Sequence, residues 1–288
     1  MILIDYSQVA ISNIAVQLAM SKDKNVLSIP MVRHMILNSI RGYVHKFKYD
    51  YPGEVVICVD GPDPWRRDIF EQYKAKRREG RNNDDRDWES VFGLIHTIKE
   101  EIRDNFPYKV VQLDKVEADD IIAIICKKNH DKKILIISGD KDFQQLQKYP
   151  NVFQYSPTQK KFVETDSPQE YIYEHILKGD TSDGIPNFLS PDDTFVNKIK
   201  QKPVSKKKLT GWIDSLMRGN DPQDFCNEYH YRNYQRNQRL IDFDYIPDDI
   251  QTDIYKEYEK VTVSSRSKIL PYMIKNDLKE LIGKIEEF

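Results

Sequence analysis

The segment Lys133-Ile-Leu-Ile-Ile-Ser-Gly-Asp-Lys-Asp142 decides the fold class, because it joins an aliphatic run to a short acidic turn. The run from Lys133 to Ile137 has the length and composition of a strand that is buried on both faces. Other short runs share this composition and precede acidic residues: Ile2 to Ile4, Glu54 to Val59 and Val110 to Leu113. Because acidic residues follow each run, we expect carboxylates to gather beyond the strand ends of one sheet.

Amphipathic segments with helical spacing lie between these runs: Met31 to Phe47, Trp88 to Arg103 and Glu117 to Lys128. The alternation predicts an α/β fold, in which helices cover both faces of a mostly parallel central sheet. From about Tyr171 onward the pattern is helical and more polar, with predicted helices at Lys208 to Met217, Phe225 to Leu240 and Lys268 to Ile285. We therefore divide the chain into an α/β domain of residues 1–178 and a helical region of residues 179–288. Asn187 to Pro203 and the polar loop Gly80 to Arg86 are the expected flexible segments.

Composition excludes several classes of protein. Of the 288 residues, 39% are hydrophobic and 11% aromatic, which is enough for a sizeable core. The three cysteines lie far apart without a CxxC pair, which argues against a disulfide framework or a zinc site. No stretch approaches the ~20 apolar residues of a membrane helix. We expect a soluble cytoplasmic protein without membrane contact, in the host cytoplasm if the source is viral.

The net charge of −2 hides a strong segregation of charge. Trp65 to Arg81 holds seven basic residues against three acidic ones, and Asn197 to Lys208 holds six lysines and no acid. Such patches usually mark a solvated surface, but a polyanion responds to local charge rather than to the sum. In the first patch, arginines and lysines are interleaved with Tyr73, a pattern that suits phosphate contacts and base stacking.

Five acidic motifs occur in order along the chain: Leu3-Ile-Asp5, Cys58-Val-Asp60, Glu117-Ala-Asp-Asp120, Gly139-Asp-Lys-Asp142 and Gly179-Asp-Thr-Ser-Asp183. One aspartate after a strand is more often a turn or helix cap than a ligand. Converging carboxylates, however, repel one another unless cations join them. Oxygen ligands suit Mg²⁺, and two such ions roughly 4 Å apart can serve a phosphodiester hydrolase. The sequence therefore predicts a site for two Mg²⁺ ions, with Mn²⁺ as an alternative ion.

Three of these blocks resemble the signature motifs of the 5′-nuclease family, which includes flap endonucleases: Glu117-Ala-Asp-Asp-Ile121, Gly139-Asp-Lys-Asp-Phe-Gln-Gln-Leu146 and Gly179-Asp-Thr-Ser-Asp-Gly-Ile-Pro186. Within that family the chain is most similar to the ribonucleases H of T-even-like bacteriophages. That similarity rests on further segments spread over nearly the whole chain: Leu3-Ile-Asp-Tyr-Ser-Gln8, Met31-Val-Arg-His34, Trp65-Arg-Arg-Asp68, His130 to Ser138, Lys148-Tyr-Pro-Asn-Val152 and Leu240-Ile-Asp-Phe-Asp-Tyr-Ile-Pro247.

The resemblance implies roles for the acidic residues. The first metal site would use Asp5, Asp60, Glu117, Asp119 and Asp140. The second would share Asp140 and add Asp142, Asp180 and Asp183, partly through water. Asp120 matches the motif either as a ligand or as a residue that supports one.

The resemblance also implies roles for the basic residues. Residues 65–88 would form a helical arch over the site, in which Lys74 and Arg77 act on the scissile phosphate. The expected nucleic-acid contacts are Arg66, Arg67, Tyr73, Lys76, Arg78, Lys198, Lys200, Lys206, Lys207 and Lys208. Gly179 to Pro186 resembles the start of the family's helix–two-turn–helix, but no Gly-x-Gly hairpin follows it. A potassium site in that hairpin is therefore in doubt.

The implied activity is a 5′-3′ exonuclease and flap endonuclease that removes RNA primers and adjacent DNA during phage DNA replication. Its substrates would be RNA/DNA hybrids, double-stranded DNA with a 5′ end, and flap or fork DNA. We expect a monomer that interacts with a sliding clamp and with a single-strand DNA-binding protein.

Three other classes of protein fit the sequence less well. An inactive nucleic-acid-binding scaffold would tolerate the loss of carboxylates, whereas all five motifs are intact. A two-aspartate phosphatase needs its Asp-x-Asp after the first strand, whereas Asp140-Lys-Asp142 follows the fourth. A small toxin-like ribonuclease shares the acid cluster but lacks the arch and the C-terminal helices.

Overall fold

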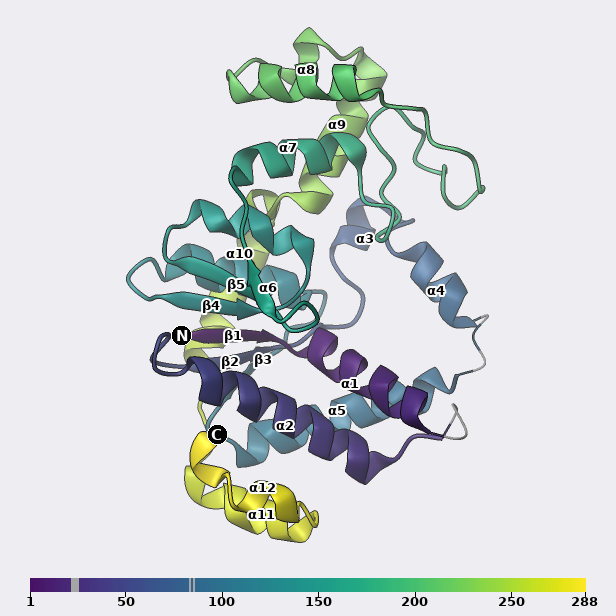
Figure 1. Cartoon of the computed structure of the whole chain (residues 1–288). Helices are drawn as coiled ribbons and strands as arrows, with labels where there is room; N and C mark the ends of the chain where they lie inside the picture. The colour runs from purple at the N-terminus through teal and green to yellow at the C-terminus, as the bar shows by residue number, and fades with distance from the viewer. Residues whose placement is uncertain (22–25, 83, 85) are drawn as a thin grey trace.

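The computed structural model describes residues 1–21, 26–82, 84 and 86–288, and within them the chain forms a six-stranded sheet (Figure 1). Its order is β3-β2-β1-β4-β5-β6. The strands are β1 (Ile2–Asp5), β2 (Val55–Cys58), β3 (Lys109–Val111), β4 (Ile134–Ile137), β5 (Val152–Ser156) and β6 (Lys161–Val163). The first five strands are parallel and only the edge strand β6 is antiparallel. The predicted mostly parallel sheet is confirmed.

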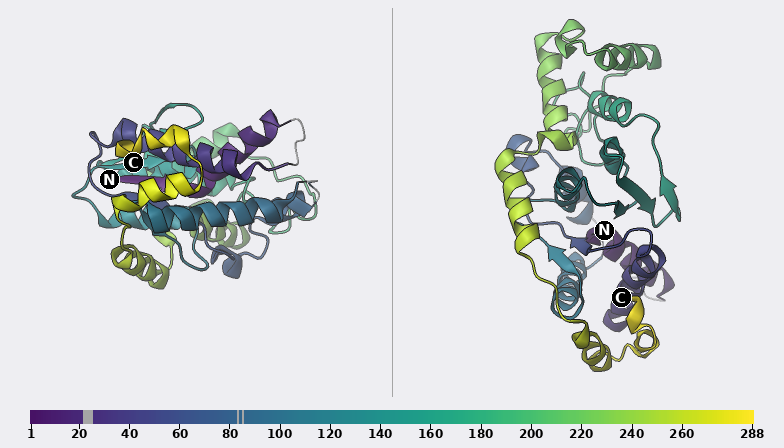
Figure 2. Two further views of the ribbon diagram at one scale, coloured as in Figure 1. Left: turned by 90° about the horizontal axis from the view of Figure 1, so that it is seen from below. Right: turned by 90° about the vertical axis from the view of Figure 1, so that its left-hand side faces the viewer.

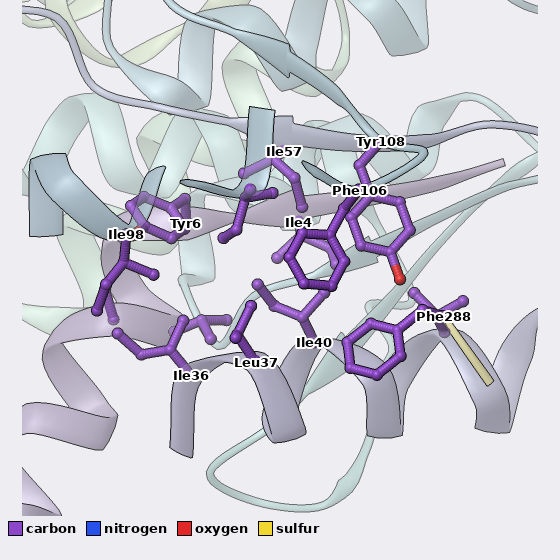
Figure 3. Close-up of a cluster of buried hydrophobic side chains, with 14 of the residues drawn as sticks. Ile4, Tyr6, Ile36, Leu37, Ile40, Ile57, Ile98, Phe106, Tyr108 and Phe288 are labelled. Carbon is purple, nitrogen blue, oxygen red and sulfur yellow. The ribbon is translucent and has the colours of Figure 1, made fainter. Parts of the chain in front are cut away.

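Helices bury both faces of this sheet. Ile2 and Ile4 point into one cluster, Leu3 between them points into the other, and all three are at most 1% exposed. The first cluster includes side chains from α1 (Tyr6–Met20), α2 (Ile29–Phe47), α5 (Trp88–Asn105), α11 (Ile269–Lys275) and α12 (Lys279–Ile282). Figure 3 shows part of it, with Ile4 and Ile57 of the sheet above Ile40 of α2. The second cluster includes α6 (Ala118–Lys128), the 3-10 helix η1 (Lys141–Lys148) and α10 (Asp248–Lys260).

A third cluster joins α7 (Pro168–Lys178), α8 (Lys206–Met217) and α9 (Glu228–Ile241) at one end of the molecule (Figure 2). Phe70 and Tyr73, from the predicted arch, also belong to this cluster. The chain after α9 returns to the α/β part, where α10 packs on α6. Residues 248–288 are mostly helical, and their buried side chains belong to the first two clusters rather than to the third.

The arch segment consists of two short helices, α3 (Arg66–Ile69) and α4 (Ala75–Asn82). Between them Lys74 has a φ of +56°, a conformation that costs a non-glycine residue energy. Its backbone N–H donates to the carbonyl of Asp183 at 2.8 Å, which ties this turn to the loop after α7. In the expected flexible loop Gly80 to Arg86, the helix continues to Asn82; Asn83 and Asp85 lie outside the described residues.

Several elements differ from the sequence prediction. Helices α1 and α10 and strands β5 and β6 were not predicted. The helix predicted at Lys268 to Ile285 is interrupted at Asp277, which has a φ of +53°. The segment Asn187 to Pro203 has turns only, but Asn187 Nδ2 closes it by donating to the Lys202 carbonyl at 2.9 Å. Among the described residues, none of the helices has both the length and the apolarity that a membrane span requires.

Candidate active site

Parallel strands bring the acidic motifs to one edge of the sheet. Asp5 ends β1 and caps α1, where its Oδ1 accepts from the Gln8 N–H at 3.1 Å. Asp60 follows β2, and its Oδ1 accepts from the N–H of Ala118, the first residue of α6, at 2.8 Å. This contact brings the neighbouring Asp119 to the same edge. Asp140 follows β4 and caps η1 through the Asp142 N–H at 3.0 Å. Each carboxylate is therefore placed by a strand end and by a helix start.

Four of these carboxylates influence one another strongly. Burial, followed by repulsion from Asp60, raises the pKa of Asp5 to about 7, although hydrogen bonds from Gln8 and Ser138 lower it. Burial and repulsion from Asp140 and then Asp5 raise the pKa of Asp119 well above its usual range. Buried like charges of this kind are stable only when they are protonated or joined by cations. A set of hard oxygen donors suits Mg²⁺. Asp5, Asp60, Asp119 and Asp140 therefore form a group that fits a divalent cation.

A second group lies between η1 and the loop after α7. Asp142, His175 and Asp180 each offer one ligand atom, and these atoms all lie within 4.8 Å of one another. Burial raises the pKa of Asp142 to about 7 against the influence of His175. Burial also opposes ionisation of Asp180, but contacts with His175 and Ser182 outweigh it and lower the pKa of Asp180. The second group is thus a carboxylate pair with an imidazole between its members.

A glycine fixes the turn that carries Asp180. Gly179 has a φ of +67°, and a Cβ there would lie 2.4 Å from the Ile185 carbonyl oxygen. Asp180 and Ile185 then pair as an isolated bridge. Only glycine fits this close approach, which explains why the Gly-Asp pair opens the last acidic motif.

Glu117 and Asp183 are already neutralised by cations of the arch. Lys74 Nζ contacts Glu117 Oε1 at 2.5 Å and Asp183 Oδ2 at 3.5 Å, and Arg77 reaches Asp183 Oδ1 at 2.5 Å. Tyr73 donates to Glu117 and Asp183 at 2.9 and 3.0 Å. Although burial opposes it, Lys74 and Arg66 lower the pKa of Glu117 to about 2. Metal ligation by Glu117 and Asp183, and the catalytic roles of Lys74 and Arg77, stay predictions.

Asp120 and Arg66 need a correction. Asp120 is 0% exposed, and its carboxylate accepts from Arg66 at 2.7 and 2.9 Å and from the Trp65 indole at 2.9 Å. Arg66 also contacts Glu117 at 2.8 Å and donates to the Leu240 carbonyl at 2.8 Å. Of the two roles expected for Asp120, this geometry favours the supporting one over metal ligation, and the nucleic-acid contact expected of Arg66 is wrong. The Asp120 carboxylate and the Arg66 guanidinium bind each other in a buried ion pair.

Tyr73 needs the same correction, because its ring is only 3% exposed and packs in the third cluster. Arg67 is paired with Asp63 at 2.7 Å. The remaining predicted nucleic-acid contacts are exposed and stay predictions: Lys76, Arg78, Lys198, Lys200, Lys206, Lys207 and Lys208. Lys76 lies over the ring of Phe195 and Lys198 pairs with Glu79, so both contacts link α4 to the segment Asn187 to Pro203.

Sequence reasoning missed several residues of the site. Ser138 donates to Asp5 at 3.1 Å, and Gln8 accepts from the Gly139 N–H at 2.6 Å, so both hold β1 and β4 together at the acidic edge. His175 was also missed, although it lies one helical turn before the Gly179-Asp180 motif. A histidine at that spacing from an acidic motif is the signal that could have found it.

Two family models match the chain. Residues 1–175 match the family model of the 5′-3′ exonuclease N-terminal resolvase-like domain, and residues 166–288 match that of the C-terminal domain of T4 RNase H. The chain therefore belongs to the 5′-3′ exonuclease family, and it is a nuclease that hydrolyses phosphodiester bonds. This confirms the resemblance that the acidic motifs indicated.

Among individual relatives, the chain is 38% identical to the Ribonuclease H of Enterobacteria phage T4 over 295 residues, which covers 99% of this chain and 95% of that protein. It is 33% identical to the 5′-3′ exonuclease of Buchnera aphidicola over 114 residues, 38% of this chain and 34% of that one.

Solved structures share the fold. The bacteriophage T5 flap endonuclease, in a pseudo-enzyme-product complex with DNA and metal ions, superimposes with a TM-score of 0.61 at 16% identity, covering 90% of this chain and 97% of that one. The T5 5′-exonuclease with bound zinc ions gives a TM-score of 0.60, covering 91% and 98%. Both likenesses confirm the predicted fold class.

Replacing Arg66 by methionine is expected to lower the free energy of unfolding by about 3–5 kcal/mol, because Glu117 and Asp120 would stay buried without their cation. Urea denaturation in the presence of chelator measures this. Arg67→Met is the matched control, since its partner Asp63 is 80% exposed and such pairs contribute under about 1 kcal/mol. Equal losses in the two variants would contradict the assigned importance of the buried network.

Stability without metal should depend on pH. The folded-state pKa of Asp5 is about 7 against an ordinary value of 3.8, so the folded protein holds this proton more tightly than the unfolded chain does. The stabilising contribution is therefore present at low pH and is lost as pH rises from about 4 to about 7. In chelator, the Tm of Asp5→Asn should fall less between these pH values than the Tm of the natural chain. Identical pH dependences would show that Asp5 titrates normally.

Proposed function

We propose that the chain is a two-metal 5′-3′ exonuclease and flap endonuclease that uses Mg²⁺, with Mn²⁺ as an alternative ion. The observation that carries this proposal is the convergence of Asp5, Asp60, Asp119 and Asp140 at one sheet edge, where burial and repulsion from the neighbouring carboxylates raise the pKa of Asp5 and of Asp119. A second group, with Asp142 and Asp180, lies beside Asp140 and supports a second ion. These carboxylates would hold the ions, which would supply positive charge beside a phosphodiester and a bound water of lowered pKa.

The chain's own residues then bind and orient the substrate. Lys74 and Arg77 rest on Glu117 and Asp183, at the margin of the carboxylate groups. A phosphate that enters with metal ions would compete with these carboxylates for the two cations. Lys74 and Arg77 are therefore placed to stabilise negative charge that develops on the reacting phosphate. The strained turn at Lys74 fixes this side chain close to the acidic edge.

The proposed substrates are RNA/DNA hybrids, double-stranded DNA with a 5′ end, and flap or fork DNA. Support comes from the name of the phage T4 relative, Ribonuclease H, and from the DNA in the T5 complex. The exposed lysines between Asn197 and Lys208 supply positive charge for contacts with backbone phosphates. Removal of RNA primers and adjacent DNA during phage DNA replication is the proposed role.

The proposed setting follows from the same role. A replication nuclease would meet a sliding clamp and a single-strand DNA-binding protein, and we propose that it does so as a monomer. Cys58, Cys126 and Cys226 are free thiols, which supports a reducing compartment, the cytoplasm of a host cell. We propose that residues 1–178 form the catalytic domain and that residues 179–288 add DNA contacts.

Cleavage of a 5′-labelled flap substrate should require Mg²⁺ and stop in chelator. Asp119→Asn should abolish cleavage but keep substrate binding, because the variant loses a ligand and a charge that repels phosphate. Product gels and binding titrations measure the two effects. Asp114→Asn is the matched control, since this exposed aspartate follows β3 outside the acidic groups. Cleavage in chelator, or full turnover by Asp119→Asn, would contradict the metal assignment.

Two lysines should separate chemistry from binding. Lys74→Ala should lower the single-turnover rate at saturating enzyme, because the lost charge acts on the reacting phosphate. The expected increase in the activation free energy is about 2.7–4 kcal/mol. Exposed Lys207 should instead contribute to affinity, and Lys207→Ala should flatten the salt dependence of binding by about one unit of slope. If Lys74→Ala changes affinity alone, the arch is a binding surface without a catalytic role.

A further inference from the structure

His175 lies between two carboxylates that the sequence assigned to the second metal site. Its Nε2 is 3.5 Å from Asp142 Oδ1 and 3.5 Å from Asp180 Oδ2. These distances are longer than the about 2.7–3.2 Å of a good N–H···O hydrogen bond. The nitrogen is buried, yet it has no hydrogen-bond partner of good geometry. The imidazole is therefore directed at a point between two carboxylates, within ion-pair distance of each but without a good hydrogen bond to either.

The spacing matches that of ligands around a divalent ion. Ligand atoms at ~2.1 Å from an octahedral ion lie ~3.0 Å apart when adjacent and ~4.2 Å apart when opposite. The separations of 3.5 Å fall between these limits, and all three ligand atoms lie within 4.8 Å. An ion can thus contact His175, Asp142 and Asp180 with small movements of the side chains.

Neighbouring residues hold all three ligands in this orientation. The Tyr171 ring stacks on the imidazole at 5.7 Å, and its hydroxyl donates to Asp142 Oδ1 at 3.4 Å. Ser182 donates to Asp180 Oδ1 from both its N–H and its Oγ, each at 2.7 Å. These bonds occupy one oxygen of Asp180 and leave Oδ2 facing His175. The protein's own contacts therefore hold these three side chains in position without an ion.

An imidazole changes which ion the second site prefers. Mg²⁺ favours oxygen ligands and its bound waters, whereas first-row transition ions accept imidazole nitrogen readily. Mn²⁺ combines both preferences, because it also binds carboxylates well. The first group, which has carboxylates alone, gives no such advantage.

We propose that His175 is a direct ligand of the second metal site and that it makes this site prefer Mn²⁺ over Mg²⁺. This proposal rests on the proposed function, because it concerns one of the two metal sites assumed there. It adds a nitrogen ligand to a site that the sequence motifs describe with carboxylates only.

Pulsed electron paramagnetic resonance of the full chain with bound Mn²⁺ tests the proposal directly. A nitrogen ligand couples to the manganese electron spin, so the natural chain should show nitrogen-14 modulation that His175→Gln loses. Labelling the histidines of the natural chain with nitrogen-15 should change the modulation in a known way, which requires no variant. Mn²⁺ binding to the second site should weaken at least ~10-fold in His175→Gln. Mg²⁺-supported flap cleavage should be less affected than Mn²⁺-supported cleavage.

His130→Gln is the matched control, since exposed His130 precedes β4 at the opposite end of the strand and packs beside Tyr149. It should keep both the modulation and the Mn²⁺ affinity. Bound Mn²⁺ without nitrogen modulation, in a chain that still cleaves its substrate, would overturn the role of His175 and leave the proposed function standing. A chain that binds no Mn²⁺ and cleaves nothing with either ion would overturn both.

Discussion

The buried ion pair between Arg66 and Asp120 fixes the relative positions of three parts of the chain. Arg66 lies in α3 of the arch segment, and Asp120 lies in the first turn of α6. The same guanidinium donates to the carbonyl of Leu240, which lies at the end of α9. A guanidinium removed from water is stable only where its donors meet acceptors in good geometry. This requirement admits few arrangements of these parts. The arch, the acidic edge of the sheet and the helical cluster therefore share one anchor.

Around that anchor, the acidic residues divide according to the charge beside them. Glu117 and Asp183 lie against Lys74 and Arg77, so their charge is balanced within the protein. Burial raises the pKa values of Asp5 and Asp119, and their charged neighbours, which are mainly other carboxylates, raise them further. The imbalance is therefore confined to the sheet edge, where a divalent ion would relieve it. Local charge balance, rather than the number of acids, therefore separates the carboxylates that already have a cation of the chain beside them from those that do not.

Much of the fold could be predicted from particular residues. The aliphatic runs at Ile2 and Ile134 identified buried parallel strands, because both sheet faces are covered. Helix α1 was missed because apolar residues occur on most of its sides and give no clear stripe, and β6 because three edge residues carry little pattern. Arg66 and Tyr73 were misassigned for one reason: a basic, aromatic segment has the same composition whether it faces DNA or a buried carboxylate.

The sequence by itself determined the family, the mostly parallel sheet and the set of acids that follow its strands, since these depend on local pattern and on motif order. Only the tertiary structure decided which acids pair with a cation of the chain and which face other carboxylates. Asp119 and Asp120 are adjacent in sequence, yet helical geometry turns Asp119 toward Asp140 and Asp120 toward Arg66. His175 likewise joins Asp142 only because α7 packs on η1. Burial and neighbouring charge set the chemistry of each side chain, and both arise from contacts between segments distant in the chain.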